Sequence, residues 1–246
     1  MNVTAVVLGG GQGDDPLAAR FGVPVKALIP IAGEPMAAHV LRALRAGGAK
    51  HIVYVGPVTP DLESLADTVI PAKGEMLENL QVGLEGIGNA KRVLVATADI
   101  PLLTADAVRD VLSRDSGIGL VYPIVSMITS ERMFPGGKRT AARVKEGRFT
   151  GGNLFLLEPR LVNDFLPRLR FILENRKNVL KLASMFGLGA LVKLTLGVLS
   201  ITELEGTVSR ILGVPARALI TEYAQIGFDV DKEKDLEVVL NRLAST

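Results

Sequence analysis

The chain has 246 residues, and its 28 Lys and Arg against 26 Asp and Glu give a formal charge of +2, which is too balanced for a protein that mainly binds nucleic acid. With 48% hydrophobic and 22% charged residues, the composition excludes a disordered or fibrous protein and favours a compact globular one. The absence of cysteine and the presence of only two histidines exclude disulfide frameworks, thiolate metal sites, cysteine nucleophiles and histidine-rich metal centres.

The first element is a short apolar run, Val3–Leu8, of the kind found in strands that are buried on both faces of a parallel sheet. It has no basic flank and no cleavage site, so we expect no secretion signal and a cytoplasmic protein. Helical spacing over Pro35–Ala46 ends at Gly47-Gly48, and a second apolar run, His51–Val55, predicts the next strand.

The same alternation continues to residue 121. Helical spacing covers Glu75–Leu84, and Arg92–Thr97 predicts a third buried strand. Thr104 is placed to cap a helix that ends near Arg114, and Gly117–Val121 returns to strand character. Alternating strands and helices predict an α/β fold with a doubly wound, mostly parallel, Rossmann-like sheet.

The second half of the chain is less regular. Ala141–Lys145 and Arg148–Leu157 flank a turn at Glu146-Gly147 and predict a hairpin. Further elements are expected as helices between residues 160 and 213, a strand over Arg217–Ile220 and a closing amphipathic helix over Lys232–Leu243. Because no linker, low-complexity tract or internal repeat divides the chain, we expect a single domain with an elaborated helical second lobe.

The segment from Asn175 to Thr202 is strongly apolar and has no acidic residue. Its basic residues leave no uncharged run of about 18 residues, so we expect no transmembrane segment. Buried helices whose lysines reach solvent are the interpretation we favour. A basic amphipathic surface that makes peripheral contact with a membrane is the alternative.

A glycine-rich stretch, Gly9-Gly10-Gly11-Gln12-Gly13, directly follows the first predicted strand. Glycines let backbone N–H groups close around an anion, so this stretch predicts a phosphate-binding loop. Its spacing matches neither the dinucleotide-binding fingerprint nor the P-loop. A tight glycine turn that binds no ligand is the alternative.

The residues that follow the loop, Pro24 and Lys26 and then Ala32-Gly33-Glu34-Pro35-Met36, complete a recognisable pattern. Together with the loop they resemble the signature of nucleotidyltransferases of the nucleoside-diphosphate-sugar type, and they are most similar to the branch that contains molybdenum-cofactor guanylyltransferase. The resemblance implies a GT-A-type nucleotidyltransferase fold. It implies nucleotide binding by Leu8, Gly9, Gly10, Gly11, Gln12, Gly13, Lys26 and Asn79, of which Lys26 would neutralise the triphosphate and Asn79 would contact the base. An ordinary asparagine on an exposed helix face is the alternative for Asn79.

One position departs from the family pattern. The family usually has an arginine just after the loop, where this chain has Asp14-Asp15. Two acidic residues beside a triphosphate should repel it. Arg20 could supply the missing positive charge, or the two acids could help to hold a metal.

Asp99 lies at the carboxyl end of the predicted strand Arg92–Thr97, at the edge where open α/β sheets bind their ligands. Mg²⁺ needs only one or two carboxylates, because phosphates and water complete its coordination shell. The string Thr97-Ala98-Asp99-Ile100-Pro101-Leu102 resembles the metal-binding aspartate motif of the family, which implies a magnesium ligand at Asp99. A helix-capping role is the alternative.

The segment Phe228–Leu236 resembles a late motif of the family, in which an acidic or amide residue precedes the last helix. The resemblance implies a second magnesium contact at Asp231, with Asp229 as the near alternative. Another interpretation makes one of these two residues the N-cap of the closing helix, with Glu233 and Asp235 in its first turn.

Gly152 and Asn153, at the start of an apolar run, are similar to the acceptor-binding stretch of the family. A side chain that can both donate and accept hydrogen bonds suits a hydroxylated acceptor, whereas a β-bulge is the alternative. The preceding loop is basic through Lys138, Arg139 and Arg143, and would either receive a phosphorylated acceptor or be solvated.

We therefore expect a nucleotidyltransferase that uses Mg²⁺, with Lys26 and Asp99 as catalytic residues. Its partners would be a nucleoside triphosphate and a small phosphorylated acceptor, with pyrophosphate as the leaving group. Within the single domain, residues 1–122 would bind the nucleotide, residues 123–226 would form the acceptor side and residues 227–246 would carry the late metal motif. A non-catalytic nucleotide sensor and a GT-A-type glycosyltransferase that uses a nucleotide sugar are the alternatives.

Overall fold

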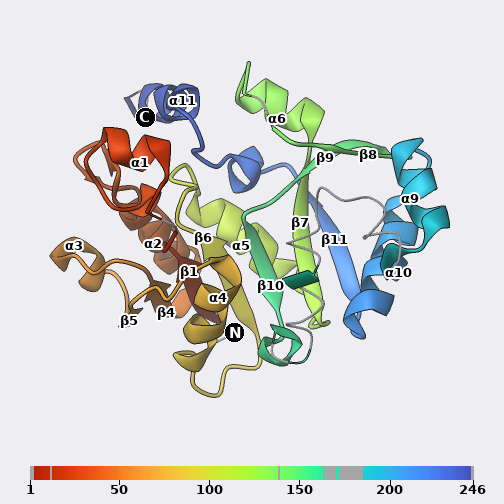
Figure 1. Ribbon diagram of the computed structural model, residues 1–246, viewed down its shortest axis with the longest axis horizontal. Helices are drawn as coiled ribbons and strands as arrows, with labels where there is room; N and C mark the ends of the chain where they lie inside the picture. Colours follow the sequence, from red (N-terminus) through yellow and green to blue (C-terminus); the bar gives the residue numbers. More distant parts are fainter. Residues whose placement is uncertain are drawn as a thin grey trace.

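The computed structural model describes residues 3–11, 13–137, 139–162, 164, 170–171 and 185–244. A central sheet with the strand order β5-β4-β1-β6-β10-β7-β9-β8 runs through the described part of the chain, and β11 pairs with β7 beside this path. Helices cover the sheet on both sides (Figure 1). The expected doubly wound, mostly parallel α/β fold is confirmed.

The first half of the chain forms the parallel part of the sheet. Its strands are β1 (Val3–Leu8), β4 (Ala49–Val55), β5 (Thr68–Ile70) and β6 (Val93–Thr97). Its helices are α1 (Pro16–Arg20), α2 (Met36–Gly47), α3 (Pro60–Glu63), α4 (Met76–Glu85) and α5 (Ala105–Ser113), with a 3-10 turn at Lys26–Leu28 and a small ladder of β2 (Pro30–Ile31) with β3 (Glu34–Pro35). The predicted strands and long helices of this half are confirmed, whereas α1, α3 and β5 are too short to have given a periodic signal.

Strand β1 shows why this half folds as it does. Ala5 and Val7 point into the cluster that contains α2 and α5, while Val6 and Leu8 point into the cluster that contains α4. Because successive side chains of a strand point to opposite faces, an all-apolar strand needs cover on both sides. Burial of each valine or leucine side chain in this strand contributes about 1.5–3 kcal/mol.

The described part of the second half adds five strands to the same sheet, in both parallel and antiparallel pairs. They are β7 (Leu120–Ser126), β8 (Ala142–Val144), β9 (Gly147–Gly151), β10 (Leu154–Leu157) and β11 (Ala216–Thr221). Strand β10 lies between β6 and β7 and is antiparallel to both, while β11 is parallel to β7. The helical elements are α6 (Met127–Met133), α9 (Leu188–Thr195), α10 (Ile201–Leu212), a 3-10 turn at Ala224–Gly227 and α11 (Glu233–Ala244).

The prediction of one continuous strand over Arg148–Leu157 is wrong. Strand β9 pairs with β8 and with the carboxyl end of β7, whereas β10 pairs with β6 and with the beginning of β7. The chain changes partners at Gly152-Asn153, where a Cβ on Gly152 would overlap Ile226. The unbroken apolar pattern could not reveal this change of partner.

The apolar segment from Asn175 to Thr202 lies partly outside the described residues. Its described part holds α9, whose Lys193 forms an ion pair with Glu203 of α10. None of the helices in the described part of the chain is both long and apolar enough to cross a membrane.

Candidate active site

The glycine loop continues directly from β1, and tight contacts hold its first half. Gly9 donates its backbone N–H to the carbonyl oxygen of Val55 at 2.8 Å. A Cβ on Gly9 would overlap the Tyr54 ring, and a Cβ on Gly10 would overlap Ala72. By contrast, a Cβ on Gly11 would have open space around it. Packing within the protein therefore requires glycine at positions 9 and 10, whereas position 11 has room for a side chain.

Asn79 lies behind this loop and is fully buried. Its amide oxygen accepts hydrogen bonds from the backbone N–H groups of Lys73 and Gly74, at 2.9 and 3.4 Å, and its amide nitrogen donates to the Gly74 carbonyl at 2.9 Å. A Cβ on Gly10 would also crowd this amide. The exposed-face alternative is wrong, because the side chain holds the 73–74 turn against the glycine loop. Contact with a base stays a prediction.

Asp14 and Asp15 both line a cavity of about 420 Å³ in front of the loop. Asp15 is the N-cap of α1, and its carboxylate accepts hydrogen bonds from the backbone N–H groups of Leu17 and Ala18 at 2.9 and 3.0 Å. This capping offsets part of its negative charge with the positive end of a short helix. Arg20, the expected substitute cation, forms an ion pair with Glu233 at the start of α11.

We call this space the loop cavity. Leu8, Gly9, Gly10 and Gly11 line it, together with Lys26 and Asp99. Gln12 lies outside the described residues, and Gly13 has open space where a Cβ would stand. The structure thus brings most of the predicted nucleotide-binding residues to one cavity.

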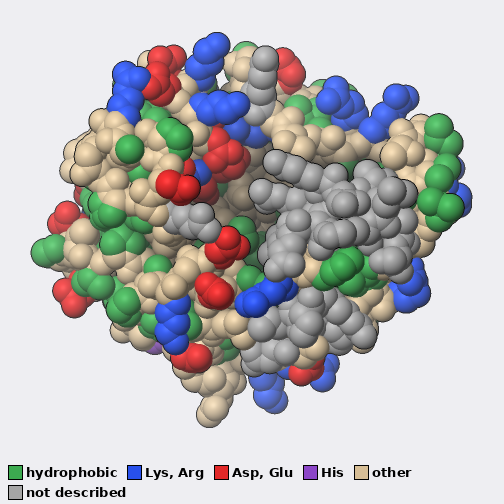
Figure 2. Space-filling view, in the orientation of Figure 1, with side chains coloured by type: hydrophobic (Ala, Val, Ile, Leu, Met, Phe, Trp, Pro, Cys, Tyr) green, Lys and Arg blue, Asp and Glu red, His purple; other side chains and the backbone are tan. Residues whose placement is uncertain are grey.

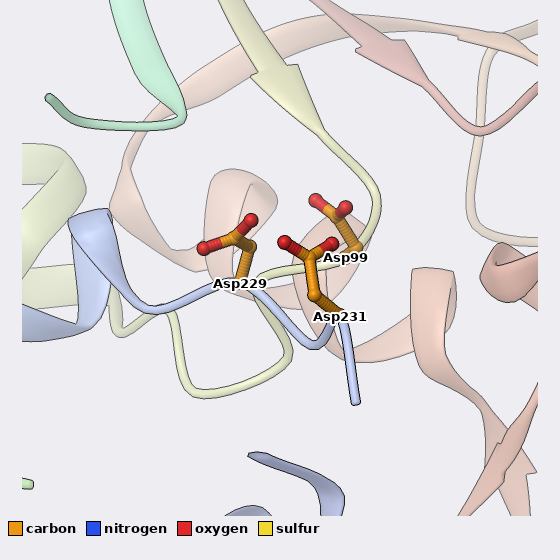
Figure 3. A group of neighbouring side chains, drawn as sticks. All are labelled: Asp99, Asp229 and Asp231. Carbon is orange, nitrogen blue, oxygen red and sulfur yellow. The ribbon is translucent and has the colours of Figure 1, made fainter. Parts of the chain in front are cut away.

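Three carboxylates meet beside the loop cavity. Asp99 comes from the end of β6, and Asp229 and Asp231 come from the segment before α11 (Figure 3). One oxygen of each lies within 4.8 Å of the others. The fold therefore places both candidates for the second metal contact, Asp231 and Asp229, next to Asp99.

The segment that carries the last two acids is extended. Phe228 and Val230 are buried in the core beneath it, so the alternating residues Asp229 and Asp231 face the site. Val230 donates its backbone N–H to the carbonyl oxygen of Asp99 at 2.9 Å. This hydrogen bond joins the late motif to the end of β6.

Lys26 neutralises part of the acidic cluster. Its Nζ lies 3.1 Å from Asp99 Oδ2 and 2.7 Å from Asp231 Oδ1, and it also donates to the carbonyl oxygen of Val230 at 3.2 Å. Burial alone would lower the pKa of Lys26, but the two carboxylates raise it above its ordinary value. Thr97 donates its hydroxyl to the other oxygen of Asp99 at 2.6 Å.

Arg139 supports the far side of the cluster. Its guanidinium donates to the carbonyl oxygen of Asp229 at 2.8 Å and to the carboxylate of Asp235 at 3.2 Å, and it lies 4.0 Å from the centroid of the Phe228 ring. Its side chain is only 6% exposed, so this arginine is not a solvated loop residue. Asp235 in turn accepts hydrogen bonds from the backbone N–H groups of Asp231 and Lys232. Asp235 therefore holds the backbone that leads into α11, and the Asp231 carboxylate faces the site.

The pKa values of Asp229 and Asp231 are shifted in opposite directions. Burial, together with the charges of Asp99 and Asp231, raises the pKa of Asp229 to about 6. Burial would also raise the pKa of Asp231, but the hydrogen bond and charge of Lys26 lower it below its ordinary value. Crowded carboxylates of this kind gain from a nearby divalent cation, which would favour their charged forms.

The cluster fits a hard divalent cation. Carboxylate oxygens are the ligands that Mg²⁺ prefers, and one or two are enough when phosphates and water complete the shell. Three carboxylates from two segments offer that donor set, with Lys26 as the present counter-ion. Asp99 and Asp231 are the two that Lys26 already bridges.

A second, wider cavity of about 1010 Å³ lies on the other side of the cluster. Asp229 and Asp231 line it, and so do Asn153, Lys232 and Lys234. The backbone of Asn153 is fixed by hydrogen bonds to Ile226 and Thr97, at 2.8 and 3.0 Å. Gly152 is packed against Ile226, so of the two predicted acceptor residues only Asn153 lines this wide cavity.

Sequence reasoning did not single out the role of Arg139, which it placed among basic loop residues. The three acidic residues Asp229, Asp231 and Asp235 have the spacing D-x-D-x-x-x-D and lie about 90 residues after Arg139. Pairing this acidic motif with an arginine elsewhere in the chain is the only signal that could have revealed the role of Arg139. Lys138, beside it, lies outside the described residues. The Arg143 side chain lies against Gly197, in the segment that joins α9 to α10.

Comparisons with known proteins show which proteins the chain resembles. The model of the MobA-like NTP transferase domain family matches residues 5–149. The chain is 32% identical over 128 residues to the bifunctional protein GlmU of Clavibacter sepedonicus, a match that covers 46% of this chain and 24% of that protein. It is 30% identical over 139 residues to the 2-C-methyl-D-erythritol 4-phosphate cytidylyltransferase of Saccharopolyspora erythraea, covering 51% of this chain and 60% of that protein. The matches thus span less than two thirds of the length of these relatives.

Solved structures match over nearly the whole chain. A hypothetical transferase from Thermus thermophilus is 49% identical, with a TM-score of 0.88 over 96% of this chain and 100% of that one. The 2-C-methyl-D-erythritol 4-phosphate cytidylyltransferase of the same species is 16% identical, with a TM-score of 0.59 over 100% of both chains. The second likeness shows a shared fold.

Proposed function

Because the chain belongs to the family of MobA-like NTP transferase domains, we propose that it transfers a nucleoside monophosphate from a nucleoside triphosphate to a phosphorylated acceptor. The observation that carries the proposal is the meeting of Asp99, Asp229 and Asp231 with Lys26 between two cavities. One cavity has the glycine loop as a wall, and the other has exposed lysines. A triphosphate in the first and an acceptor in the second would meet at the carboxylates.

In this mechanism an oxygen of the acceptor phosphate attacks the α-phosphorus, a new phosphoanhydride bond forms, and the bond to pyrophosphate breaks. Such transfers depend on positioning and charge neutralisation more than on a protein nucleophile. The backbone N–H groups of Gly10 and Gly11 would hold the leaving pyrophosphate, because that of Gly9 is already bonded to Val55. Lys26 would follow the phosphates, because its ammonium group is a mobile point charge.

Asp99 and Asp231 would hold Mg²⁺, which when bound stabilises the negative charge that develops on the phosphates. Lys26 bridges these two carboxylates in the free protein. A bound metal would compete with Lys26 for these carboxylates, and a triphosphate oxygen would offer the ammonium group a new partner. We propose that this exchange couples nucleotide binding to metal binding.

The two cavities also support the proposed division of the chain. The described residues that line the loop cavity fall between positions 8 and 99, whereas those of the wide cavity fall between positions 122 and 238. Residues 1–122 would thus bind the nucleotide and residues 123–226 the acceptor, with the late motif contributing the metal contact. The protein would act in the cytoplasm, where the triphosphate is available.

The test is transfer of label from each [α-³²P]nucleoside triphosphate to a panel of sugar and alkyl phosphates, with Mg²⁺ or with a chelator. We expect pyrophosphate release and a labelled product with one nucleotide in the presence of Mg²⁺ only. Magnesium-dependent binding without turnover would favour the nucleotide sensor. Turnover of a nucleotide sugar with no use of the free triphosphate would favour the glycosyltransferase.

A further inference from the structure

A third cavity, of about 450 Å³, opens beside the wide one, and its walls are strongly apolar. We call it the apolar groove. The residues that line it come from β7, β11, the β8–β9 hairpin and α10. The side chains that line it include Leu120, Ile124, Phe149, Leu204 and Val208.

The apolar groove and the wide cavity adjoin each other. Four residues line both, namely Tyr122, Thr140, Thr150 and Gly151. Tyr122 lies at the junction, with its hydroxyl against Gly151. From Ile124 to Leu120 the groove follows β7 for about 13 Å, at roughly 3.3 Å per residue. A long molecule could thus have one end at the acidic cluster and the other end between α10 and the sheet.

The two adjoining cavities differ in polarity. The wall of the wide cavity carries Lys232 and Lys234, which suit a phosphate group, together with the acidic residues Asp229, Asp231, Asp235 and Glu237. The apolar groove is lined by aliphatic and aromatic side chains, and the carboxylate of Glu205 at its wall accepts the backbone N–H of Ala218. Ligand pockets of this volume with mainly apolar walls bind apolar groups.

Helix α9 presents a second apolar feature beside the groove. Leu188, Val192 and Leu196 recur every four residues on one face, and they are 67%, 47% and 66% exposed. Figure 2 shows hydrophobic side chains gathered at the right edge of the molecule, where Figure 1 places α9. The helix contacts β8, which forms one side of the groove. Exposed aliphatic side chains in this position suit a substrate that is presented by a lipid surface.

We propose that the acceptor is an alkyl or prenyl phosphate, whose phosphate lies in the wide cavity and whose hydrocarbon chain lies in the apolar groove. This inference rests on the proposed nucleotidyl transfer and specifies its acceptor. The phosphate oxygen of such a lipid would attack the α-phosphorus, and the product would be a nucleoside diphosphate linked to a hydrocarbon chain, with pyrophosphate released.

The test uses the whole chain and n-alkyl phosphates from ethyl to dodecyl, each below its critical micelle concentration. Calorimetry measures their binding in the presence of Mg²⁺, and label transfer measures their use as acceptors. We expect affinity to rise by up to about fourfold for each buried methylene and to level off when the groove is full. Affinity and transfer that do not depend on chain length would overturn the proposal.

Two variants fill the groove from different walls, Ala218→Phe on β11 and Ala142→Phe on β8. In each variant, the ratio of the affinity for dodecyl phosphate to the affinity for ethyl phosphate should fall at least tenfold. The affinities for ethyl phosphate and for the nucleotide should stay as in the wild type. The matched control is Ala46→Phe, at an exposed position of α2. A melting temperature and magnesium-dependent nucleotide binding report folding in each variant.

The two levels of the proposal fail in different ways. Binding of a nucleoside triphosphate with Mg²⁺, together with indifference to alkyl length, would overturn the lipid acceptor and leave nucleotidyl transfer standing. Absence of binding by every nucleoside triphosphate would overturn nucleotidyl transfer and the acceptor with it. A further experiment presents dodecyl phosphate in vesicles at low salt. We expect the double variant Leu188→Ser and Leu196→Ser to slow nucleotidyl transfer to the vesicle-bound substrate. Transfer to monomeric decyl phosphate should stay unchanged. Equal slowing with both substrates would overturn the contribution of α9.

Discussion

The glycine loop and the acidic cluster lie at the same edge of the sheet but are held in opposite ways. The loop is fixed by neutral contacts, with Gly9 bonded to Val55, Tyr54 packed beneath it and the buried amide of Asn79 behind it. The cluster is held by charges, with Lys26 between two carboxylates on one side and Arg139 on the other.

This difference indicates how each region should respond to a ligand. A loop held by packing and backbone hydrogen bonds keeps its shape whether or not a phosphate is bound, so it is preorganised. In a cluster held by an internal cation, a bound metal would compete with that cation for the carboxylates. We therefore expect changes in the loop to act on folding and on nucleotide affinity, and changes in the cluster to act mainly on metal-dependent steps.

The largest effect should come from the cluster. Asp99→Asn removes a carboxylate that faces the site while keeping the shape and the bond from Thr97. Metal-dependent turnover should fall by about 1000-fold or more, because the charge that orients the phosphates is lost. Label transfer under saturating Mg²⁺ measures this, with Asp61→Asn, an exposed acid on α3, as the matched control. Equal losses in both variants would mean that Asp99 has no special role.

The next effect distinguishes two neighbouring glycines. Gly10→Ala places a methyl group against Ala72 and Asn79, whereas Gly11→Ala places it in open space. We expect Gly10→Ala to lower the free energy of unfolding by about 1–3 kcal/mol and Gly11→Ala to change it little. Urea denaturation of the ligand-free proteins measures both. If Gly11→Ala also destabilises the free protein by that amount, the loop is not held as described.

A smaller effect should follow from removing the internal cation. Lys26→Met leaves Asp99 and Asp231 facing each other without a counter-ion. We expect a loss of about 1–2 kcal/mol in the absence of metal, and recovery of part of it by Mg²⁺, which would replace the ammonium group. Thermal unfolding with and without Mg²⁺ measures the recovery. A variant that Mg²⁺ stabilises less than the wild type would contradict the exchange of lysine for metal.

The smallest effect concerns the neutral support of the loop. In the described part of the structure the Tyr54 hydroxyl is buried and has no hydrogen-bond partner, and burial raises its pKa above the ordinary value. Tyr54→Phe removes this unpaired group and keeps the ring beneath Gly9. We expect unfolding free energy to stay the same or to rise by up to about 1 kcal/mol. A clear loss of stability would show that the hydroxyl has a partner that holds the loop.

Much of this arrangement could be predicted from local sequence signals. The apolar runs Val3–Leu8 and Arg92–Thr97 predicted strands, and their position before the glycines and before Asp99 predicted a shared edge. The resemblance to the NTP transferase family is confirmed by the match over residues 5–149. These features depend on residues that lie close together in the sequence, where periodicity and motif spacing are informative.

Other features depend on contacts between distant residues, and the sequence could not show them. Arg139 carries no motif of its own, and its partners Asp229 and Asp235 lie beyond the whole second lobe. Asn79 was expected either to contact the base or to lie on an exposed helix face, and the sequence did not show that it is buried and bonded to the 73–74 turn. The apolar groove arises only when β7, β11 and α10 are assembled, because each contributes a few ordinary apolar side chains.

The central claim is that the loop and the acidic cluster form a single site for a magnesium–nucleotide complex. Calorimetric titration of the wild type and of Asp99→Asn with each nucleoside triphosphate, with and without Mg²⁺, tests it most directly. We predict that Mg²⁺ tightens the binding of one nucleotide to the wild type at least tenfold, and that this gain disappears in Asp99→Asn while metal-free binding persists. An equal gain from Mg²⁺ in both proteins would contradict the claim, because the metal would then bind without the cluster.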